Sequence, residues 1–409
     1  MTKSAPGDIR ALVAARFDAE VAFLAELVKV ASDNPPGDCV PHAERAATLL
    51  AAMGFAVERH NVPDEVARRH GMARVANLVV RHRFGPGPVI ALNAHGDVVP
   101  PGEGWTHDPY GAAIADGWMY GRGVAVSKSD FATYAFALDA LKRSGRNLKG
   151  TVELHLTYDE EAGGEIGPGW LLERGISKPD LAIGAGFSYG VVTAHNGCLH
   201  LEVEAKGRSA HAAKPATGID ALEVATDIMS AIYAYRRMLP ARVSAVPGIG
   251  SPQVTVGLIK GGINTNVVPD RITFRLDRRM IPEEAPASVE AEVRALIEGT
   301  ARRHPHASVE VRRILLAKPL TELARGRTMT EVLCRHASRI MGVPVDAGGV
   351  PLYTDARHYA ERGIPIVLYG AGPRTIEEAN AHRADERLEL ADLEKATAVI
   401  AETLAELLI

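Results

Sequence analysis

The chain has 409 residues, more than one compact core usually holds, so we expect two domains. Apolar residues make up 46% and charged residues 23%, as in a soluble globular protein, and a net charge of -4 gives no basic surface for nucleic acid. No apolar run approaches the roughly 18 residues of a membrane span, and the charged N-terminal segment lacks the apolar core of a signal peptide, so we expect a cytoplasmic protein.

The three cysteines, Cys39, Cys198 and Cys334, are odd in number and far apart. They form neither a disulfide framework nor a closely spaced metal-binding motif.

The first half of the chain alternates helices with buried strands. Apolar periodicity predicts helices over residues 8–31, 41–53 and 131–143, and continuous apolar runs predict strands over 89–95 and 151–159. This alternating order is typical of a mostly parallel sheet flanked by helices.

The pattern changes after residue 196. Four segments (LHLEVEAKG, VTVGLIKGG, ITFRLDRR and SVEVRRIL) alternate with a period near two, which indicates an antiparallel sheet with one wet face. Helices are expected between them, near 218–237 and 283–302.

The α/β pattern then resumes, with a helix expected at 325–341, a strand at 364–370 and a helix at 391–408. We therefore predict a discontinuous α/β domain (residues 1–196 and 316–409) that is interrupted by a smaller α+β antiparallel domain (197–315).

Two polar clusters follow predicted buried strands, where ligands gather in α/β sheets. In NAHGDVVP, His95 ends a strand and Asp97 lies two residues on, a spacing that lets a carboxylate orient a metal-binding imidazole. In YDEEAGGEIG, three adjacent acids, Asp159, Glu160 and Glu161, repel one another unless a cation or a proton is shared. Taken alone, the first cluster also fits a loop histidine, and the second a solvated charge run.

Two further histidines lie in Gly- and Pro-bounded segments: His382 in NAHRADERL and His211 in GRSAHAAKP. Each by itself fits an ordinary surface or turn residue. In combination, the ordered series HGDVVP, GW..DPY, GRG...K, DEE.GG, GRSAH, NTNVVPD, TDAR and AHRADER resembles the co-catalytic zinc hydrolases. That family includes acetylornithine deacetylase, succinyl-diaminopimelate desuccinylase, carboxypeptidase G and the aminoacylases, and the resemblance covers nearly the whole chain.

The resemblance implies roles for residues of the α/β domain. His95, Glu161 and His382 match metal ligands, Asp97 matches the partner of the first histidine, and Glu160 matches the general base that activates water. The implied reaction is metal-assisted hydrolysis of an amide.

The resemblance also implies a lid that usually forms a homodimer. His211 matches the lid histidine that stabilises the tetrahedral intermediate, often from the partner subunit. Asn266, Arg278 and the turn Gly370–Gly372 match positions that hold a substrate carboxylate, as in an N-acyl or N-carbamoyl amino acid.

Two carboxylate ligands of the family are missing. The acid that bridges the two metals in the family's GRGxxD motif corresponds to Val126, and a second acid corresponds to the region of Gly186. Lys128 keeps the register, and the nearest acid, Asp130, lies about one helical turn late. Lys128 and Asp130 could be recruited to the site or could only pair with each other, and we favour the pairing.

Three interpretations remain open. A single Zn, Mn or Co ion could take His95, Glu161 and His382 and leave a position open for water. Alternatively, no metal binds, Glu160 and Glu161 share a proton, and the protein is an isomerase, a lyase or a metal-free hydrolase. In the third, catalysis is lost and a small carboxylate is bound. Survival of so many polar site residues favours an enzyme, and amide hydrolysis over other chemistry.

Overall fold

The structure is a computed structural model and describes residues 7–409. These residues form two compact units. The larger comprises the described residues up to Thr193 together with Glu322–Gly348 and Thr354–Ile409, and the smaller comprises Ala194–Thr321 and Gly349–Tyr353. The interruption predicted from sequence, 197–315, lies within the first segment of the smaller unit.

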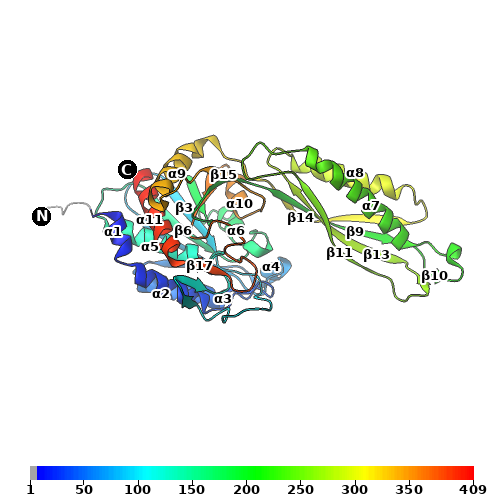
Figure 1. Cartoon of the computed structure of the whole chain (residues 1–409), viewed down its shortest axis with the longest axis horizontal. Helices are drawn as coiled ribbons and strands as arrows, with labels where there is room; N and C mark the ends of the chain where they lie inside the picture. Colours follow the sequence, from blue (N-terminus) through cyan, green and yellow to red (C-terminus); the bar gives the residue numbers. More distant parts are fainter. Residues whose placement is uncertain (1–6) are drawn as a thin grey trace. The chain divides into compact units, whose positions relative to one another are not determined.

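The larger unit is built on an eight-stranded sheet (Figure 1). Its strand order is β1 (Val57–Asn61), β2 (Ala76–Arg83), β6 (Thr151–Thr157), β3 (Val89–His95), β7 (Leu181–Gly184), β16 (Ile366–Leu368), β8 (Val191–His195) and β15 (Ala347–Val350). The central strands β6, β3, β7 and β16 pair in parallel, whereas β1 with β2, β2 with β6 and β16 with β8 are antiparallel pairs. The mostly parallel sheet predicted from sequence is therefore confirmed.

Helices cover this sheet because their apolar faces need burial. The Ala-rich α5 (Lys128–Arg143) is buried along nearly its whole length, because it packs against the sheet, α2 (Phe17–Val28) and α11 (Leu390–Leu407). The other helices of the unit are α1 (Ile9–Ala14), α3 (Val40–Ala52), α4 (Asp64–Arg69), α6 (Pro168–Glu173), α9 (Arg327–Met341) and α10 (Ala356–Ala360).

The single helix predicted at 8–31 is wrong in one respect, since it is broken between α1 and α2. Arg16 leaves the helical conformation, and its guanidinium lies 3.6 Å from an Asp139 carboxylate oxygen and over the ring of Phe136, both on α5. Tertiary contacts with α5 accompany the break in a segment whose periodicity alone favours one helix.

Short elements complete the larger unit. They are a three-stranded sheet of β17 (Arg387–Glu389), β5 (Trp118–Tyr120) and β4 (Ala113–Ala115), and the 3₁₀ helices η1 (Glu160–Ala162) and η4 (Ala324–Gly326).

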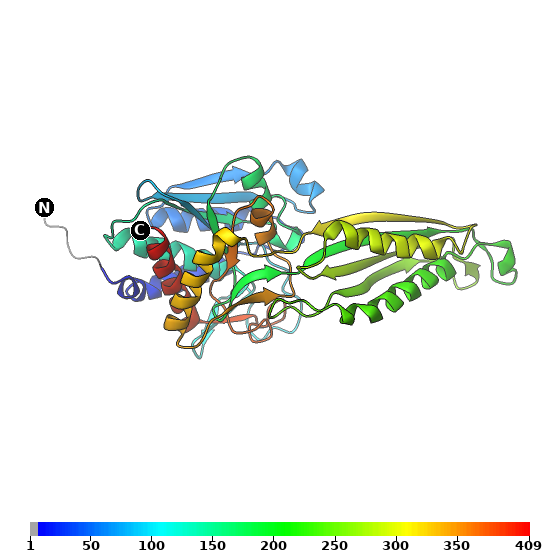
Figure 2. The ribbon, with the colours of Figure 1, turned by 90° about the horizontal axis from the view of Figure 1, so that it is seen from above.

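The smaller unit is a four-stranded antiparallel sheet in the order β11 (Gln253–Gly261), β13 (Arg271–Met280), β9 (Gly197–Lys206) and β14 (Ser308–Ala317). Helices α7 (Ala221–Met238) and α8 (Pro286–Ala301) run along one face of it (Figure 1, Figure 2). On β9, Leu199, Leu201 and Val203 are buried in the core that these helices share, and the intervening side chains form the wet face. The α+β antiparallel class predicted for this part of the chain is confirmed.

The remaining elements of the smaller unit are the pair β10 (Ala210–His211) and β12 (Val267–Val268), with 3₁₀ helices η2 (Pro215–Thr217) and η3 (Leu239–Ala241). Among residues 7–409, no helix combines the length and the apolar character that crossing a membrane requires.

Candidate functional site

Four loops meet at one edge of the larger sheet. The parallel strands β3, β6, β7 and β16 end there, and they lead into His95, Glu160, Gly186 and Gly370 respectively. Because the carboxyl ends of parallel strands lie at the same edge, segments far apart in sequence are brought together. The polar clusters of the sequence analysis therefore share this edge.

Asp97 connects the first two loops. Its fully buried carboxylate accepts hydrogen bonds from the backbone N–H groups of Glu160 (3.2 Å) and Glu161 (3.1 Å) and from the Asn34 amide (3.1 Å). One carboxylate oxygen also lies 3.5 Å from Nδ1 of His95. Nδ1 of His95 also lies 3.0 Å from the Asp97 backbone carbonyl oxygen, so Asp97 contacts both the histidine and the acidic turn.

The site is rich in charge that is removed from water. Burial lowers the pKa of His95, but the hydrogen bond with Asp97 and the charge of Glu160 outweigh it and raise that pKa well above its usual value. Burial raises the pKa of Glu160 to about 8, although His95 opposes the shift. Near neutral pH, Glu160 can therefore both accept and release a proton.

His382 lies beside Glu161, with 3.1 Å between its Nε2 and a carboxylate oxygen. This hydrogen bond raises the pKa of His382. His95 pairs instead with Asp97.

The proposed single-ion ligands form two pairs and not one cluster. Within the described part of the chain, one group of three or more His, Cys, Asp or Glu side chains has its ligand atoms all within 4.8 Å of one another, and that group lies in the smaller unit. The spacing between Glu161 and His382 suits two ligands of one ion, since tetrahedral N and O ligands lie about 3.3 Å apart. Val126 and Gly186 supply no carboxylate to a second ion.

The loop at Val126, where the resemblance places the family's bridging acid, is held by a residue from another segment. Glu386 accepts hydrogen bonds from the backbone N–H groups of Ala125 and Val126, both at 3.1 Å. It also forms a fully buried ion pair with Arg122. Glu386 lies in the motif AHRADER, but the sequence alone assigns it no role, because its partners lie more than 250 residues away.

At Gly186, an acid does not fit the backbone as folded. A Cβ atom added there would lie 2.8 Å from the Tyr369 nitrogen and 3.0 Å from the Leu368 carbonyl carbon. Real Cβ atoms essentially never approach backbone atoms at the shorter of these distances. The strand-end loops are thus packed too closely for any side chain at this position.

Asp130 holds these two loops together. Its buried carboxylate accepts hydrogen bonds from the backbone N–H groups of Gly186 (3.3 Å) and Ala371 (2.8 Å), and burial raises its pKa well above the usual value. Lys128 is also buried, and its Nζ donates to the Val30 carbonyl at 3.0 Å. The expected pairing between Lys128 and Asp130 is wrong, because each is held by backbone groups from other segments.

The turn Gly370–Gly372 is also held from within. The Ser188 hydroxyl donates to the Gly370 carbonyl (3.0 Å) and accepts from the Gly372 N–H (3.1 Å). With Ala371 bonded to Asp130, the backbone N–H groups of Ala371 and Gly372 already have protein partners. Binding of a substrate carboxylate by this turn remains a prediction that these contacts do not favour.

The other predicted residues belong to the smaller unit. His211 and Asn266 are exposed and adjacent, since the Ala212 N–H donates to the Asn266 carbonyl at 2.9 Å. Arg278 is fully buried, with one Nη 2.6 Å from Glu284 and Nε donating to the Tyr235 hydroxyl at 3.1 Å. These contacts do not favour its predicted role in binding substrate.

One acid near the site was quoted without a role. Asp355, from the motif TDAR, is buried, and burial together with the charge of Glu160 raises its pKa well above the usual value. Its place in the motif TDAR is the sequence signal from which Asp355 could have been assigned to the site.

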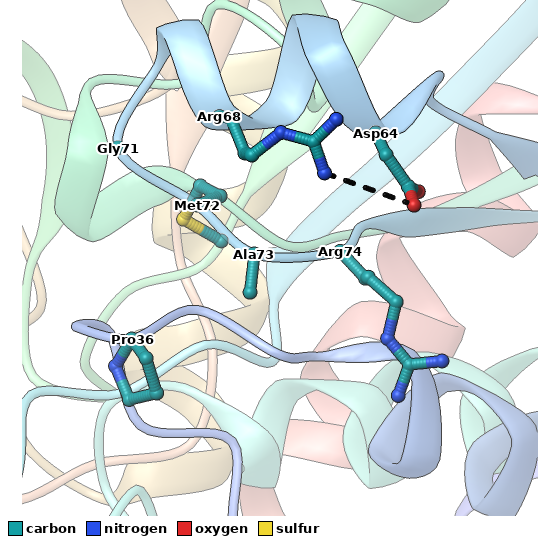
Figure 3. Close-up of a pocket in the computed structure, with 7 residues that line it drawn as sticks. All are labelled: Pro36, Asp64, Arg68, Gly71, Met72, Ala73 and Arg74. Atoms are coloured by element: carbon teal, nitrogen blue, oxygen red, sulfur yellow. Dashed lines mark ion pairs between the residues drawn. The ribbon is translucent and has the colours of Figure 1, made fainter.

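A separate surface pocket lies elsewhere in the larger unit (Figure 3). It is lined by Pro36, Asp64, Arg68, Gly71, Met72, Ala73 and Arg74. Its charges pair locally, Arg68 with Asp64 at 4.0 Å and Arg74 with Asp38 at 2.6 Å. It contains none of the predicted site residues and is not a candidate for the chemistry.

Comparison with known proteins finds a matching family, curated relatives and solved structures of the same fold. The model of peptidase family M20/M25/M40 matches residues 91–406. A succinyl-diaminopimelate desuccinylase from Wolinella succinogenes is 28% identical over 344 residues, which cover 81% of this chain and 87% of that protein. An acetylornithine deacetylase from Myxococcus xanthus is 28% identical over 375 residues, covering 90% and 92%. The structure of a dipeptidase from Saccharomyces cerevisiae shares the fold, with a TM-score of 0.78 at 12% identity and 98% of both chains covered.

The close packing at Gly186 leads to a stability prediction. We expect Gly186→Ala to lower the free energy of unfolding by about 1–3 kcal/mol, because its Cβ would force the loops apart. Gly190→Ala is the matched control, since a Cβ there meets open space. Urea denaturation of both variants measures the difference, and equal stabilities would show that the packing at Gly186 is unimportant.

Proposed function

Because the chain belongs to peptidase family M20/M25/M40, we propose that it hydrolyses the amide bond of a small carboxylate-bearing substrate such as an N-acyl or N-carbamoyl amino acid. The observation that carries this proposal is the position of Glu160, beside His95 and Asp97 at the carboxyl edge of the sheet. Family members are hydrolases of amide or peptide bonds, and the two relatives are named for removing an acyl group from an amino-acid derivative.

Glu160 is the proposed general base. Its backbone is fixed by Asp97, and its pKa of about 8 lets it take a proton from the attacking water and deliver it to the leaving amine. In the absence of an ion, His95, whose own pKa is raised, places positive charge beside it.

We also propose that the site holds at most one metal ion. Two divalent ions about 3.5–4 Å apart repel by roughly 20 kcal/mol at an effective dielectric constant near 20. Glu161 is a single carboxylate, and Val126 and Gly186 supply no other. Glu161 and His382 would hold the one ion, with His95 as third ligand through Nε2, the ring nitrogen that does not face Asp97, if the two pairs move together. An ion there would polarise the substrate carbonyl and its attacking water.

The ion count is tested by difference. We expect Glu161→Ala and His382→Ala each to remove no more than one zinc, manganese or cobalt ion per subunit relative to the parent, measured by mass spectrometry after equal loading. Counting by difference excludes ions held elsewhere in the chain. Loss of two ions from either variant would contradict the proposal.

One observation favours a metal-free variant of the same reaction. His95, Glu161 and His382 form two pairs, whereas a three-ligand cluster would bring all their ligand atoms together. Hydrolysis that persists in fully chelated protein would favour that variant, and hydrolysis restored only by metal would exclude it.

The general base is tested by Glu160→Gln. We expect kcat for the best N-acyl or N-carbamoyl amino acid to fall between about a hundredfold and ten-thousandfold, because proton transfer is lost while the shape is kept. Glu173→Gln, an exposed acid on α6, is the control and should leave kcat unchanged. If Glu160→Gln retains full activity, Glu160 is not the base. If no amide is cleaved by the parent, the fallback is a protein that binds a small carboxylate.

We further propose a homodimer formed through the smaller unit, with His211 acting in the partner's site. Strand β11 is an edge strand, and it exposes Leu258 (60%) and Ile259 (54%), while the nearby Ile263 is 79% exposed. An exposed apolar edge strand is a surface on which a second copy can pair.

The dimer is tested by light scattering. We expect the double variant Leu258→Lys/Ile259→Lys to shift the mass from two chains toward one, because charge on the edge opposes pairing. Ile314→Lys, on the opposite edge strand β14, is the control. A monomeric parent protein would contradict the dimer and the role of His211.

A further inference from the structure

The wet face of the smaller unit's sheet carries a compact cluster of three different metal-binding side chains. Cys198 and His200 lie two residues apart on β9, so both point to the same face. Asp277 on β13 lies directly opposite His200 in the antiparallel register, and Arg279 lies directly opposite Cys198. The two central strands of the sheet (Figure 1) therefore position all these side chains on a rigid surface.

Two distances within this cluster are close to those between ligands of a tetrahedral ion. The Cys198 Sγ lies 3.5 Å from one Asp277 oxygen, and the His200 Nε2 lies 3.2 Å from the other. One ligand atom from each residue can be chosen so that all three lie within 4.8 Å of one another. Ligands at the usual Zn–S and Zn–N or Zn–O lengths are about 3.3–3.6 Å apart at tetrahedral angles.

We propose that Cys198, His200 and Asp277 bind one divalent transition-metal ion, with zinc as the expected occupant. A thiolate and an imidazole select zinc or cobalt over magnesium and calcium, which prefer oxygen ligands. Three protein ligands leave a fourth position for water or another small ligand.

The ligands combine burial with access. Cys198 is fully buried, whereas the side chains of His200 and Asp277 are 33% and 32% exposed. An ion can thus enter from the solvent side and reach a sulfur that is shielded from oxidants.

Arg279 is the competing cation. Its Nε lies 3.0 and 3.1 Å from the two Asp277 oxygens, and its Nη2 lies 3.0 Å from the second. A carboxylate has about four lone-pair sites, so one oxygen can bind the ion while Arg279 keeps the other. Arg279 also lies over the ring of Tyr353, 5.4 Å from its centroid, which gives it a second contact when the ion binds.

This site is separate from the proposed catalytic residues in its chemistry. The set His95, Glu161 and His382 contains no cysteine, so a signal that requires sulfur reports on the Cys198 cluster alone. The inference therefore holds or fails independently of the proposed hydrolysis.

The test is a titration of the full-length reduced protein with cobalt(II). We expect a near-ultraviolet sulfur-to-cobalt charge-transfer absorption that saturates at one ion per chain and is displaced by zinc. Cys198→Ser should abolish it, and His200→Asn should weaken cobalt binding at least tenfold. Cys334→Ser, which changes a half-buried thiol elsewhere, should leave it unchanged.

Arg279→Gln gives the sharpest expectation, because removing the competing cation should tighten cobalt binding several-fold. Circular dichroism spectra and melting curves that match those of the parent establish that each variant folds. If Cys198→Ser does not fold, His200→Asn becomes the deciding variant. The absence of the sulfur band in the parent, or its persistence in Cys198→Ser, overturns the proposal.

Discussion

The buried carboxylate of Asp97 is the interaction on which the candidate site depends. Isolated, such a charge would be costly to remove from water, but three N–H donors and a neighbouring histidine stabilise it. The donors come from two parts of the site: the loop at Asn34, and the turn that contains the successive residues Glu160 and Glu161. The hydrogen bonds that Asp97 accepts thereby fix the ends of β3 and β6 relative to each other.

The positions of the missing acids are filled by other interactions. Asp130 ties Gly186 to the turn at Ala371, and Glu386 ties Val126 to Arg122. Each interaction pairs a buried carboxylate with backbone N–H groups, so the loops are held without an ion. A site that had merely lost its ligands would leave unpaired charge and open space. Here both loops are held by buried carboxylates, and backbone atoms close the space at Gly186.

Local pattern explains what the sequence predicts well. VIALNAH is a continuous apolar run because β3 is buried on both faces, and it places His95 at a strand end. The alternation in ITFRLDRRM reflects a sheet with one covered face. The same alternation places Arg278 on the covered face together with Leu276 and Phe274. The period of two therefore predicts that Arg278 is buried. The substrate-binding role came instead from the resemblance to a family motif.

Long-range pairing explains what the sequence does not reveal. The partners of Asp130 and Glu386 lie far along the chain, and no local spacing connects them. The edge strand β1 and its neighbour β2 were also not predicted, because charged residues end the apolar run of ANLVVRHR and β1 is largely polar. The cluster at Cys198 was not predicted either, because its residues come together only through long-range strand pairing. Its cysteine stands alone in sequence, and only the register between β9 and β13 brings Asp277 to it.

The polar cluster at the sheet edge and the cluster at Cys198 differ in the hardness of their ligand atoms, and this difference affects which metal ions each would bind. The sheet edge of the larger unit offers carboxylates and imidazoles, several of which already pair with one another. The smaller unit offers a thiol, an imidazole and a carboxylate on adjacent strands. A thiolate favours zinc over magnesium or manganese far more than a carboxylate does, so we expect the proposed Cys198 site to fill first under limiting zinc. Metal dependence of any hydrolysis then reports on the larger unit only after an ion at the proposed Cys198 site is accounted for.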